Sequence, residues 1–286
     1  MQDQQTPQQK SNPLSHWYRQ PKIYVKLPSN GDFYPPGTLD VSATGEYPVY
    51  AMTAKDELMF KTPDALLNGQ STVDVIKSCI PAIRDPWKMP TLDVDAALIA
   101  IRIATYGEGM DISAGCPSCD EENTFQFPLT DWLGNISNFV YERQVQCGEL
   151  LIHVRPYSYR EITKSSLKAF EQQRTIAVIN DDSLSDSEKL EKFGESFSKL
   201  TEMTVDIIAG CIVKIETPNG STDNQEHILD FIHNASSEVF NKINDHIQGM
   251  KTKIEIPPQQ AKCTACGFDF QIPITMDQSN FFAVRS

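Results

Sequence analysis

The sequence has few basic residues for its length and no long apolar run, and both shortages exclude classes of protein. Its 286 residues include 25 Lys and Arg against 38 Asp and Glu, a formal net charge of -13. Because phosphate contacts need clustered cations, this balance disfavours a nucleic-acid binder. No stretch approaches the roughly 20 apolar residues of a bilayer-spanning helix, and the first residues lack the apolar block of a secretory signal. We therefore expect a soluble protein made in a cytoplasm, with no membrane-spanning segment and no nucleic-acid partner.

The motifs of common enzymes are also absent from the sequence. It contains no Gly-x-x-x-x-Gly-Lys phosphate loop, no His-Glu-x-x-His motif and no Gly-x-Ser-x-Gly nucleophile elbow. Gly107-Glu108-Gly109 is a lone Gly-x-Gly after a predicted helix, which indicates a helix stop. Asp181 and Asp182 lie in a Ser/Asp-rich turn, which indicates a solvated pair. No catalytic residue is predicted, and the chain is predicted not to be an enzyme.

Cysteine is sparse, with seven in the chain, so a disulfide scaffold is excluded. Four of the seven form two Cys-x-x-Cys pairs, Cys116 with Cys119 and Cys263 with Cys266. Two intervening residues let both thiolates face one ion from a tight turn whose N–H groups point at the sulfurs. An alternating, strand-like segment ended by proline follows each pair, as in half of a zinc ribbon. The sequence therefore predicts a metal site whose ligands are Cys116, Cys119, Cys263 and Cys266.

The identity of the ion and the spacing of the pairs leave alternatives open. Structural zinc is the predicted cofactor, and iron or an iron–sulfur cluster is the alternative, because sulfur ligands alone do not exclude iron. About 140 residues separate the pairs, where a zinc ribbon usually has about 15 to 20. Loop-closure entropy grows only logarithmically with length, so a folded insertion is tolerable. The competing interpretation is two independent turns with reduced cysteines. Four thiolates saturate tetrahedral zinc, so a catalytic metal is not expected.

The remaining patterns predict an α+β fold with a small β-rich, zinc-ribbon-like core, further helices, and a large helical insertion between the two Cys-x-x-Cys knuckles. Residues 1–21 are rich in Gln, Pro, Ser and Asn and predict a flexible arm. Residues 22–110 predict an N-terminal α+β domain. Residues 111–156 together with 250–286 predict a discontinuous metal domain, and residues 157–249 predict the helical insertion.

Individual elements are predicted within these segments. β-branched and aromatic residues before turn residues predict strands at 23–27 and 47–52. Helices are expected after Thr53, after Ser71 or Thr72, and after Asp93.

The helical insertion has a long helix at its centre. Ser185 and Glu188 fit a capping box, and apolar residues at spacings of three and four follow as far as Cys211. This pattern predicts one helix of up to roughly 28 residues. Two shorter helices are expected around residues 228–232 and 239–247.

Two further cysteines and one histidine need an interpretation. Cys79 lies on the apolar stripe of a predicted helix, which indicates a small buried hydrophobe. Cys147 and His153 share a face of a predicted strand at 147–155, so they are candidates for additional metal ligands. The competing interpretation is a half-exposed strand whose alternate residues face the core.

Several segments of the chain together form a recognisable sequence pattern. They are Leu27–Pro35, Met52–Glu57, Thr62–Gly69, Asp93–Gly107, Cys116–Cys119, the second knuckle near Cys263 and the tail Asn280–Phe282. This pattern resembles the baseplate hub proteins of T-even-type contractile-tailed bacteriophages, most clearly over residues 22–130. The resemblance implies a structural or assembly role in the virion tail baseplate, after assembly in the host cytoplasm. It implies other baseplate hub and tail proteins as partners, and it transfers no catalytic residue.

Some functional alternatives stay open at this point. Lys55, Asp56 and Glu57 are candidates for a partner contact, and an ordinary charged helix N-terminus is the competing interpretation. The alternative function is a zinc-ribbon adaptor in transcription or on single-stranded nucleic acid, because the ribbon strands carry aromatics that stack on bases. Acidic residues beside those strands, such as Asp120 and Glu121, oppose it. A redox enzyme is a third alternative, but neither Cys-x-x-Cys pair opens a helix in a βαβ pattern.

Overall fold

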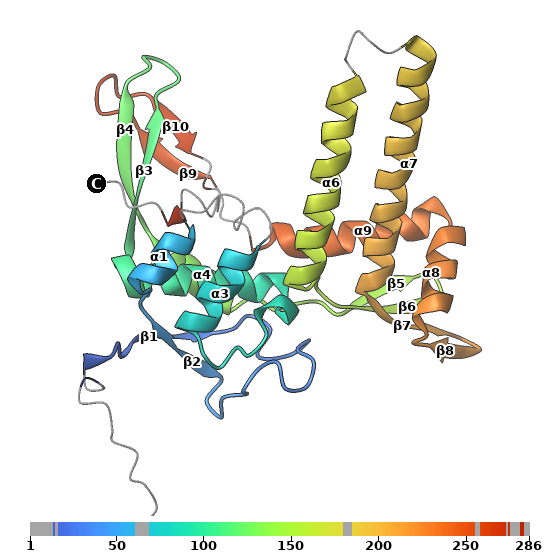
Figure 1. Ribbon diagram of the computed structural model, residues 1–286, viewed down its shortest axis with the longest axis horizontal. Helices are drawn as coiled ribbons and strands as arrows, with labels where there is room; N and C mark the ends of the chain where they lie inside the picture. Colours follow the sequence, from blue (N-terminus) through green and yellow to red (C-terminus); the bar gives the residue numbers. More distant parts are fainter. Residues whose placement is uncertain are drawn as a thin grey trace, which may run out of the picture.

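The computed structural model describes residues 14, 17–60, 69–179, 185–254, 258–272, 274, 281 and 282. Two arms rise from the same side of a body (Figure 1): one consists of two β-hairpins and the other of two long helices. Most of the predicted arm 1–21, the segment 62–68, Asp181, Asp182 and Asn280 lie outside the described residues.

Helices and short strands are mixed along the chain. The elements are β1 (Pro21–Lys26), β2 (Glu46–Tyr50), α1 (Ala54–Phe60), α3 (Gln70–Cys79), a 3-10 turn (Pro86–Lys88), α4 (Thr91–Tyr106), β3 (Gly109–Gly115), β4 (Glu122–Pro128), α5 (Leu129–Ser137), β5 (Gln144–Cys147), β6 (Leu150–Val154), α6 (Tyr159–Ile179), α7 (Asp186–Cys211), β7 (Ile212–Thr217), β8 (Gly220–Thr222), α8 (Gln225–Asn234), α9 (Ser237–Thr252), β9 (Gln259–Lys262) and β10 (Asp269–Ile272). The strands form small antiparallel sheets, β1-β2, β3-β4, β9-β10 and β5-β6-β7-β8. The predicted α+β fold class is confirmed.

The helix α4 is the centre of the first core. It is apolar around most of its circumference, and Leu98, Ile99 and Ile101 are fully buried, as a helix covered on several sides requires. β1, β2, α3 and α5 pack against it. Alternate residues of the β1-β2 hairpin, including Val25 and Val49, face this core. Cys79 is buried here as predicted.

Asp93 lies inside α4, because the helix begins at Thr91, three residues earlier than predicted. The carboxylate is buried and accepts hydrogen bonds from the Ser29 backbone N–H at 2.8 Å and from Ser29 Oγ at 2.5 Å. These bonds tie the loop after β1 to the first turn of α4. Burial raises the pKa of Asp93 to about 6, although the hydrogen bonds from Ser29 act in the opposite direction.

The substitution Asp93→Asn should flatten the pH dependence of stability between about pH 4 and pH 6. The pKa is higher in the folded chain than the roughly 3.9 of an unfolded aspartate, so the folded chain binds more protons in this range. The free energy of unfolding therefore falls as pH rises, by about 3 kcal/mol in total. Urea denaturation at about pH 4.5 and about pH 7.5 measures about 2 kcal/mol of this difference, with Asp245→Asn, at an exposed position of α9, as the control. Equal slopes in wild type and Asp93→Asn would contradict the prediction.

Asp56 takes part in an internal network and does not face a partner. It is 4% exposed, and its Oδ2 accepts hydrogen bonds from Thr53 N and Thr53 Oγ1 at 2.8 Å and from Ser78 Oγ at 3.0 Å. Arg19 lies 3.5 Å from the same oxygen and donates to Ser78 O at 2.5 Å. The predicted partner contact is therefore wrong for Asp56, because the helix start turns this side chain inward. Lys55 remains exposed.

A second core lies beneath the helical arm. The sheet β5-β6-β7-β8 packs with α8, α9 and the base of α7 around isoleucines such as Ile152, Ile215 and Ile243. β6 pairs with β7, with Ile152 opposite Ile215. Two strands of this sheet precede residue 156 and two lie in the predicted helical insertion, so the predicted boundary at 156 separates paired strands.

The segment 147–155 forms a hairpin and not one continuous strand. Cys147 ends β5, Gly148 turns the chain with φ of 59°, and His153 lies in β6. Cys147 is buried in the second core, and His153 Nε2 lies 3.1 Å from Oε1 of Glu216. Neither belongs to the cysteine cluster described below, so neither contributes a fifth ligand.

The long helix of the insertion is confirmed. α7 has 26 residues and begins with the predicted capping box, in which Ser185 Oγ donates to Glu188 Oε2 at 2.6 Å and accepts from the Glu188 N–H at 3.4 Å. α6 and α7 pack side by side and form the helical arm (Figure 1). α8 and α9 match the two shorter helices that were predicted.

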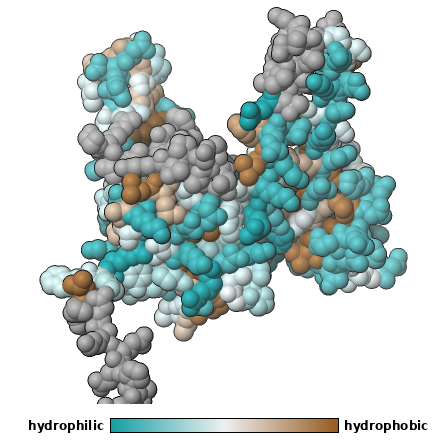
Figure 2. Space-filling view, in the orientation of Figure 1, coloured by the Kyte–Doolittle hydropathy of each residue, from teal (hydrophilic) through white to brown (hydrophobic). Residues whose placement is uncertain are grey.

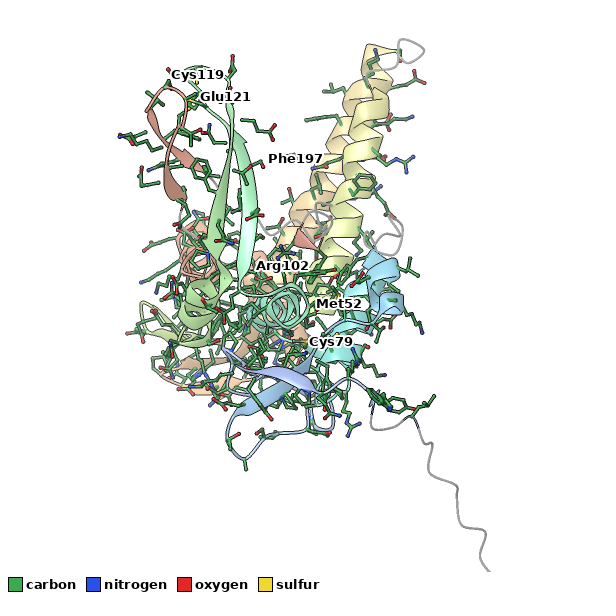
Figure 3. All side chains as sticks on the ribbon, turned by 90° about the vertical axis from the view of Figure 1, so that its left-hand side faces the viewer. Met52, Cys79, Arg102, Cys119, Glu121 and Phe197 are labelled. Carbon is green, nitrogen blue, oxygen red and sulfur yellow. The ribbon has the colours of Figure 1, made fainter. Side chains whose placement is uncertain are left out.

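The described C-terminal residues return to the first core. Phe281 and Phe282 are 3% and 6% exposed. The ring of Phe282 stacks on Phe60 with centroids 4.4 Å apart, and Arg102 Nη1 donates to the carbonyl of Phe281 at 2.6 Å. Figure 3 shows Arg102, a residue of α4, at the centre of the body. The C-terminal pair thus anchors the end of the chain to α1 and α4.

Candidate metal centre

The two predicted knuckles lie at the tips of two neighbouring hairpins. Cys116 and Cys119 are in the turn between β3 and β4, and Cys263 and Cys266 are in the turn between β9 and β10. The hairpins stand together as one arm, called here the ribbon arm (Figure 1), and Cys119 lies at its tip (Figure 3). Phe125 and Phe270 meet edge-to-face between the hairpins, with ring centroids 6.1 Å apart.

The four sulfurs form a compact cluster. All four Sγ atoms lie within 4.8 Å of one another. The distance is 3.7 Å from Cys116 to Cys266 and from Cys119 to Cys263, far longer than the roughly 2.05 Å of a disulfide. Zn–S bonds of about 2.3 Å place the sulfurs of a tetrahedral site about 3.8 Å apart. The donor set and its spacing therefore fit a tetrahedral four-thiolate metal site.

The two knuckles have the same backbone geometry. The residue after the second cysteine is left-handed in both, with φ of 58° at Asp120 and 74° at Gly267. Its N–H donates to the carbonyl of the first cysteine, at 2.9 Å from Asp120 to Cys116 and 3.0 Å from Gly267 to Cys263. Aspartate tolerates this conformation better than most residues with a side chain, and glycine adopts it freely. The repeated turn explains how segments so different in sequence present their cysteines alike.

Hydrogen bonds to the sulfur of Cys263 favour its thiolate form. At Cys263, the backbone N–H of Cys266 lowers the pKa most, burial opposes it, and the N–H of Ala265 and the amide of Asn123 add to the lowering, to about 6. The Ser118 N–H donates to Cys116 Sγ at 3.4 Å. At Cys119 the backbone N–H of Glu121 lowers the pKa, but hydrogen bonds with Cys266, burial, and hydrogen bonds with Cys263 and Cys116 outweigh it and raise the pKa to about 12. Because the thiolate is the form that binds metal ions, Cys263 is the sulfur that its turn prepares for a cation.

Asn123 joins the two knuckles and was not predicted. It is 2% exposed, and its Nδ2 donates to Glu121 O at 2.9 Å and to Cys263 Sγ at 3.5 Å. Its Oδ1 accepts from the N–H and from Oγ1 of Thr264, both at 2.8 Å. The available signal was its place on the inward side of an alternating strand, next to a knuckle, where a polar residue needs partners.

The substitution Asn123→Ala should weaken metal binding by about 10- to 100-fold, the usual effect of losing a group that orients a ligand. It removes the donor to Cys263 and leaves the Thr264 N–H without its acceptor. Competition with a chromophoric chelator measures the affinity. Asn138→Ala, at the end of α5, is the control. An affinity for Asn123→Ala within about twofold of wild type would show that Asn123 only fills space.

The surface around the cluster is acidic. Cys116 and Cys263 are buried, whereas Cys119 and Cys266 are exposed. Asp120, Glu121 and Glu122 are also exposed at this tip. A nucleic-acid interface needs cations at such a place, so the predicted absence of a nucleic-acid partner stays our expectation.

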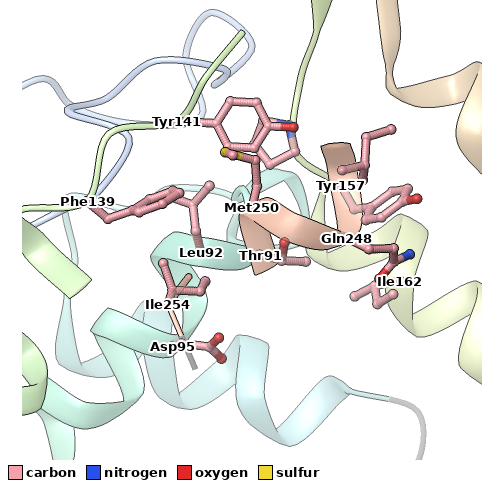
Figure 4. Close-up of a pocket in the computed structure, with 12 residues that line it drawn as sticks. Thr91, Leu92, Asp95, Phe139, Tyr141, Tyr157, Ile162, Gln248, Met250 and Ile254 are labelled. Atoms are coloured by element: carbon pink, nitrogen blue, oxygen red, sulfur yellow. The ribbon is translucent and has the colours of Figure 1, made fainter. Parts of the chain in front are cut away.

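A separate cavity of about 230 Å³ lies at the junction of the two cores (Figure 4). Its walls come mainly from apolar residues of α4, α6, α9 and the segment before β5, with Leu92, Met250 and Tyr141 among them. Among the lining residues that the structure describes, Asp95 is the one carboxylate, so these residues include no carboxylate pair for acid–base chemistry.

The chain is a mixed α+β scaffold that carries a cluster of four cysteines at the spacing of a metal site. Residues 20–283 match the family described as T4 bacteriophage base plate protein, and the chain belongs to this family. It is a structural component of a phage baseplate, and the family indicates the virion tail as its location and other phage tail proteins as its partners. No curated protein and no solved structure matches the chain. Among the described residues, no helix is long and apolar enough to cross a membrane.

Proposed function

We propose that the chain is a non-enzymatic adaptor in the central hub of a contractile-tail baseplate, and that Cys116, Cys119, Cys263 and Cys266 hold a structural zinc ion. The observation that carries the proposal is the convergence of these four sulfurs from knuckles more than 140 residues apart in the sequence. Membership of the baseplate family supports the assembly role. The sequence resemblance described above adds the central position in the hub.

The ribbon arm needs a metal ion for its stability. Isolated two-stranded hairpins are marginal in water, and β9 and β10 have only four residues each. The described buried residues at the tips are Cys116, Cys263 and the polar Asn123, so little apolar surface holds the tips together. Metal binding supplies folding free energy in such a case. Four sulfurs fill a tetrahedral shell and leave no position for water or substrate, which supports a structural and not a catalytic ion.

Tail particles purified from infected cells test the place of the protein. Mass spectrometry should find the chain in finished tails or in tail precursors assembled in the host cytoplasm, and density for it should lie in the central hub. Its reproducible absence from both would reject the proposal, and density only at the baseplate periphery would reject the hub position.

Elemental analysis of anaerobically purified protein tests the ion. We expect about one zinc per chain and a colourless protein, since zinc has no redox or visible chemistry. One or more irons per chain, together with visible absorbance, would identify the bound metal as iron and contradict the proposal of zinc.

A further inference from the structure

The helical arm exposes large apolar side chains that a solvated hairpin does not need. Leu190, Phe193 and Phe197 of α7 are 73%, 48% and 63% exposed, and Phe170 of α6 is 49% exposed. Phe193 and Phe197 stack on each other with centroids 6.5 Å apart. The space-filling view shows the two arms separated by an open notch, so the ribbon arm does not cover the helical arm (Figure 2).

These residues form a continuous uncharged face. Leu190, Phe193 and Phe197 follow one another at spacings of three and four, so they share one side of α7. Gly194 and Ser198 lie next to them, and a side chain added at Gly194 would meet nothing within 4 Å. Small residues beside aromatic rings permit close approach of another helix.

Phe170 extends the face onto α6. It lies nine residues before the end of α6, and Glu195 lies nine residues after the start of α7. In an antiparallel pair, Phe170 is therefore level with Phe193 and Phe197. Helical periodicity, with Ser196 buried against α6, puts all three rings on the same side of the hairpin. The result is an exposed apolar face that runs along the helical arm.

The charge around this apolar face indicates what binds to it. Beyond Gly194 and Ser198, the outer edge of the face is bordered by Glu191, Glu195 and Glu202. A second copy of the chain carries the same acidic edge and a net charge of -13, so pairing two copies through this face is repulsive. A helix with basic residues along one edge complements it.

We propose that the apolar face formed by Phe170, Leu190, Phe193 and Phe197 binds one amphipathic helix of another tail protein and completes a three-helix bundle. This helix has apolar residues at spacings of three and four and Lys or Arg along one edge. The inference rests on the presence of the chain in the tail, which the mass spectrometry above tests separately.

Photo-crosslinking in assembling tails tests this surface with the full chain. A photoreactive amino acid in place of Phe197 should crosslink to one other tail protein, with a yield about tenfold or more above the same amino acid in place of Lys199 on the opposite face. The crosslinked segment, mapped by mass spectrometry, should have apolar residues at spacings of three and four, as in an amphipathic helix, and basic residues along one edge of that helix. Crosslinks to a second copy, equal yields at the two positions, or a crosslinked segment without the apolar spacing would each overturn the proposal.

A charge-matched pair of variants gives an independent test. Phe193→Glu with Phe197→Glu and Lys192→Gln with Lys199→Gln both make α7 more negative by two charges, on opposite faces. The first should reduce incorporation into tails about tenfold or more, and the second should not. Helix content and metal content should remain those of wild type in both. Equal incorporation of the two variants would overturn the proposal.

Discussion

Cys263→Ser should purify with almost no bound metal and with an unfolded ribbon arm. The sulfur of Cys263 lies 3.7 Å from Cys119 and accepts hydrogen bonds that favour its thiolate, and serine offers a much poorer metal ligand at neutral pH. Structural zinc sites contribute about 10 to 16 kcal/mol of apparent binding free energy at pH 7. The short hairpins of the ribbon arm have no comparable interaction to replace it, so this is the largest effect that we expect from any single substitution.

The metal content per chain and the thermal melting curve measure this effect, and Cys116→Ser, Cys119→Ser and Cys266→Ser should behave in the same way. Cys79→Ala and Cys211→Ala are the controls. Both remove a buried thiol from a core, and both should lower stability while metal content stays that of wild type. A strong chelator should reproduce the loss of the ribbon arm in wild type. Wild-type protein with less than about a tenth of a metal ion per chain, purified without oxygen, would contradict the four-cysteine site.

Phe282→Ala should lower the free energy of unfolding by about 3 to 5 kcal/mol, the usual cost of truncating a buried phenylalanine. Its ring stacks on Phe60 and meets Phe281, whose carbonyl accepts from Arg102. The truncation therefore leaves a cavity against α1 and weakens the hold on the C-terminal end of the chain.

Chemical denaturation followed by tryptophan fluorescence measures this loss, because Trp132 lies against Phe281 with ring centroids 6.4 Å apart. Phe268→Ala is the matched control, since Phe268 is 46% exposed at the ribbon tip and should change stability by about 0.5 kcal/mol or less. Similar losses for Phe282→Ala and Phe268→Ala would show that the C-terminal pair is not anchored in the core.

The cysteine cluster and the C-terminal pair act on the same part of the chain. The β9-β10 hairpin is held at its tip by the sulfur cluster, and the chain beyond it is held by Phe281 and Phe282. Metal removal should therefore free the tip and leave the C-terminal anchor in place. The two predicted losses of stability should be largely additive, because the sites share no residue.

Features that depend on neighbouring residues were predictable from sequence. The Cys-x-x-Cys turns, the capping box at Ser185 and the 3–4 spacing along α7 each need only a few adjacent positions. The strands after the knuckles and the helices α8 and α9 followed from the same local rules. The baseplate family, in contrast, was indicated only by the resemblance, clearest in residues 22–130, and the match over residues 20–283 established it.

Features that depend on distant residues could be recognised only in the folded chain. The pairing of β6 with β7 joins residues on both sides of α6 and α7, and strand pairing leaves no signature of its partner in a single sequence. Asn123 and Asp93 look like ordinary polar residues until the knuckle of Thr264 and the loop of Ser29 close around them. Burial converts these side chains from solvated groups into structural ones, because a buried polar group must find its hydrogen-bond partners within the protein.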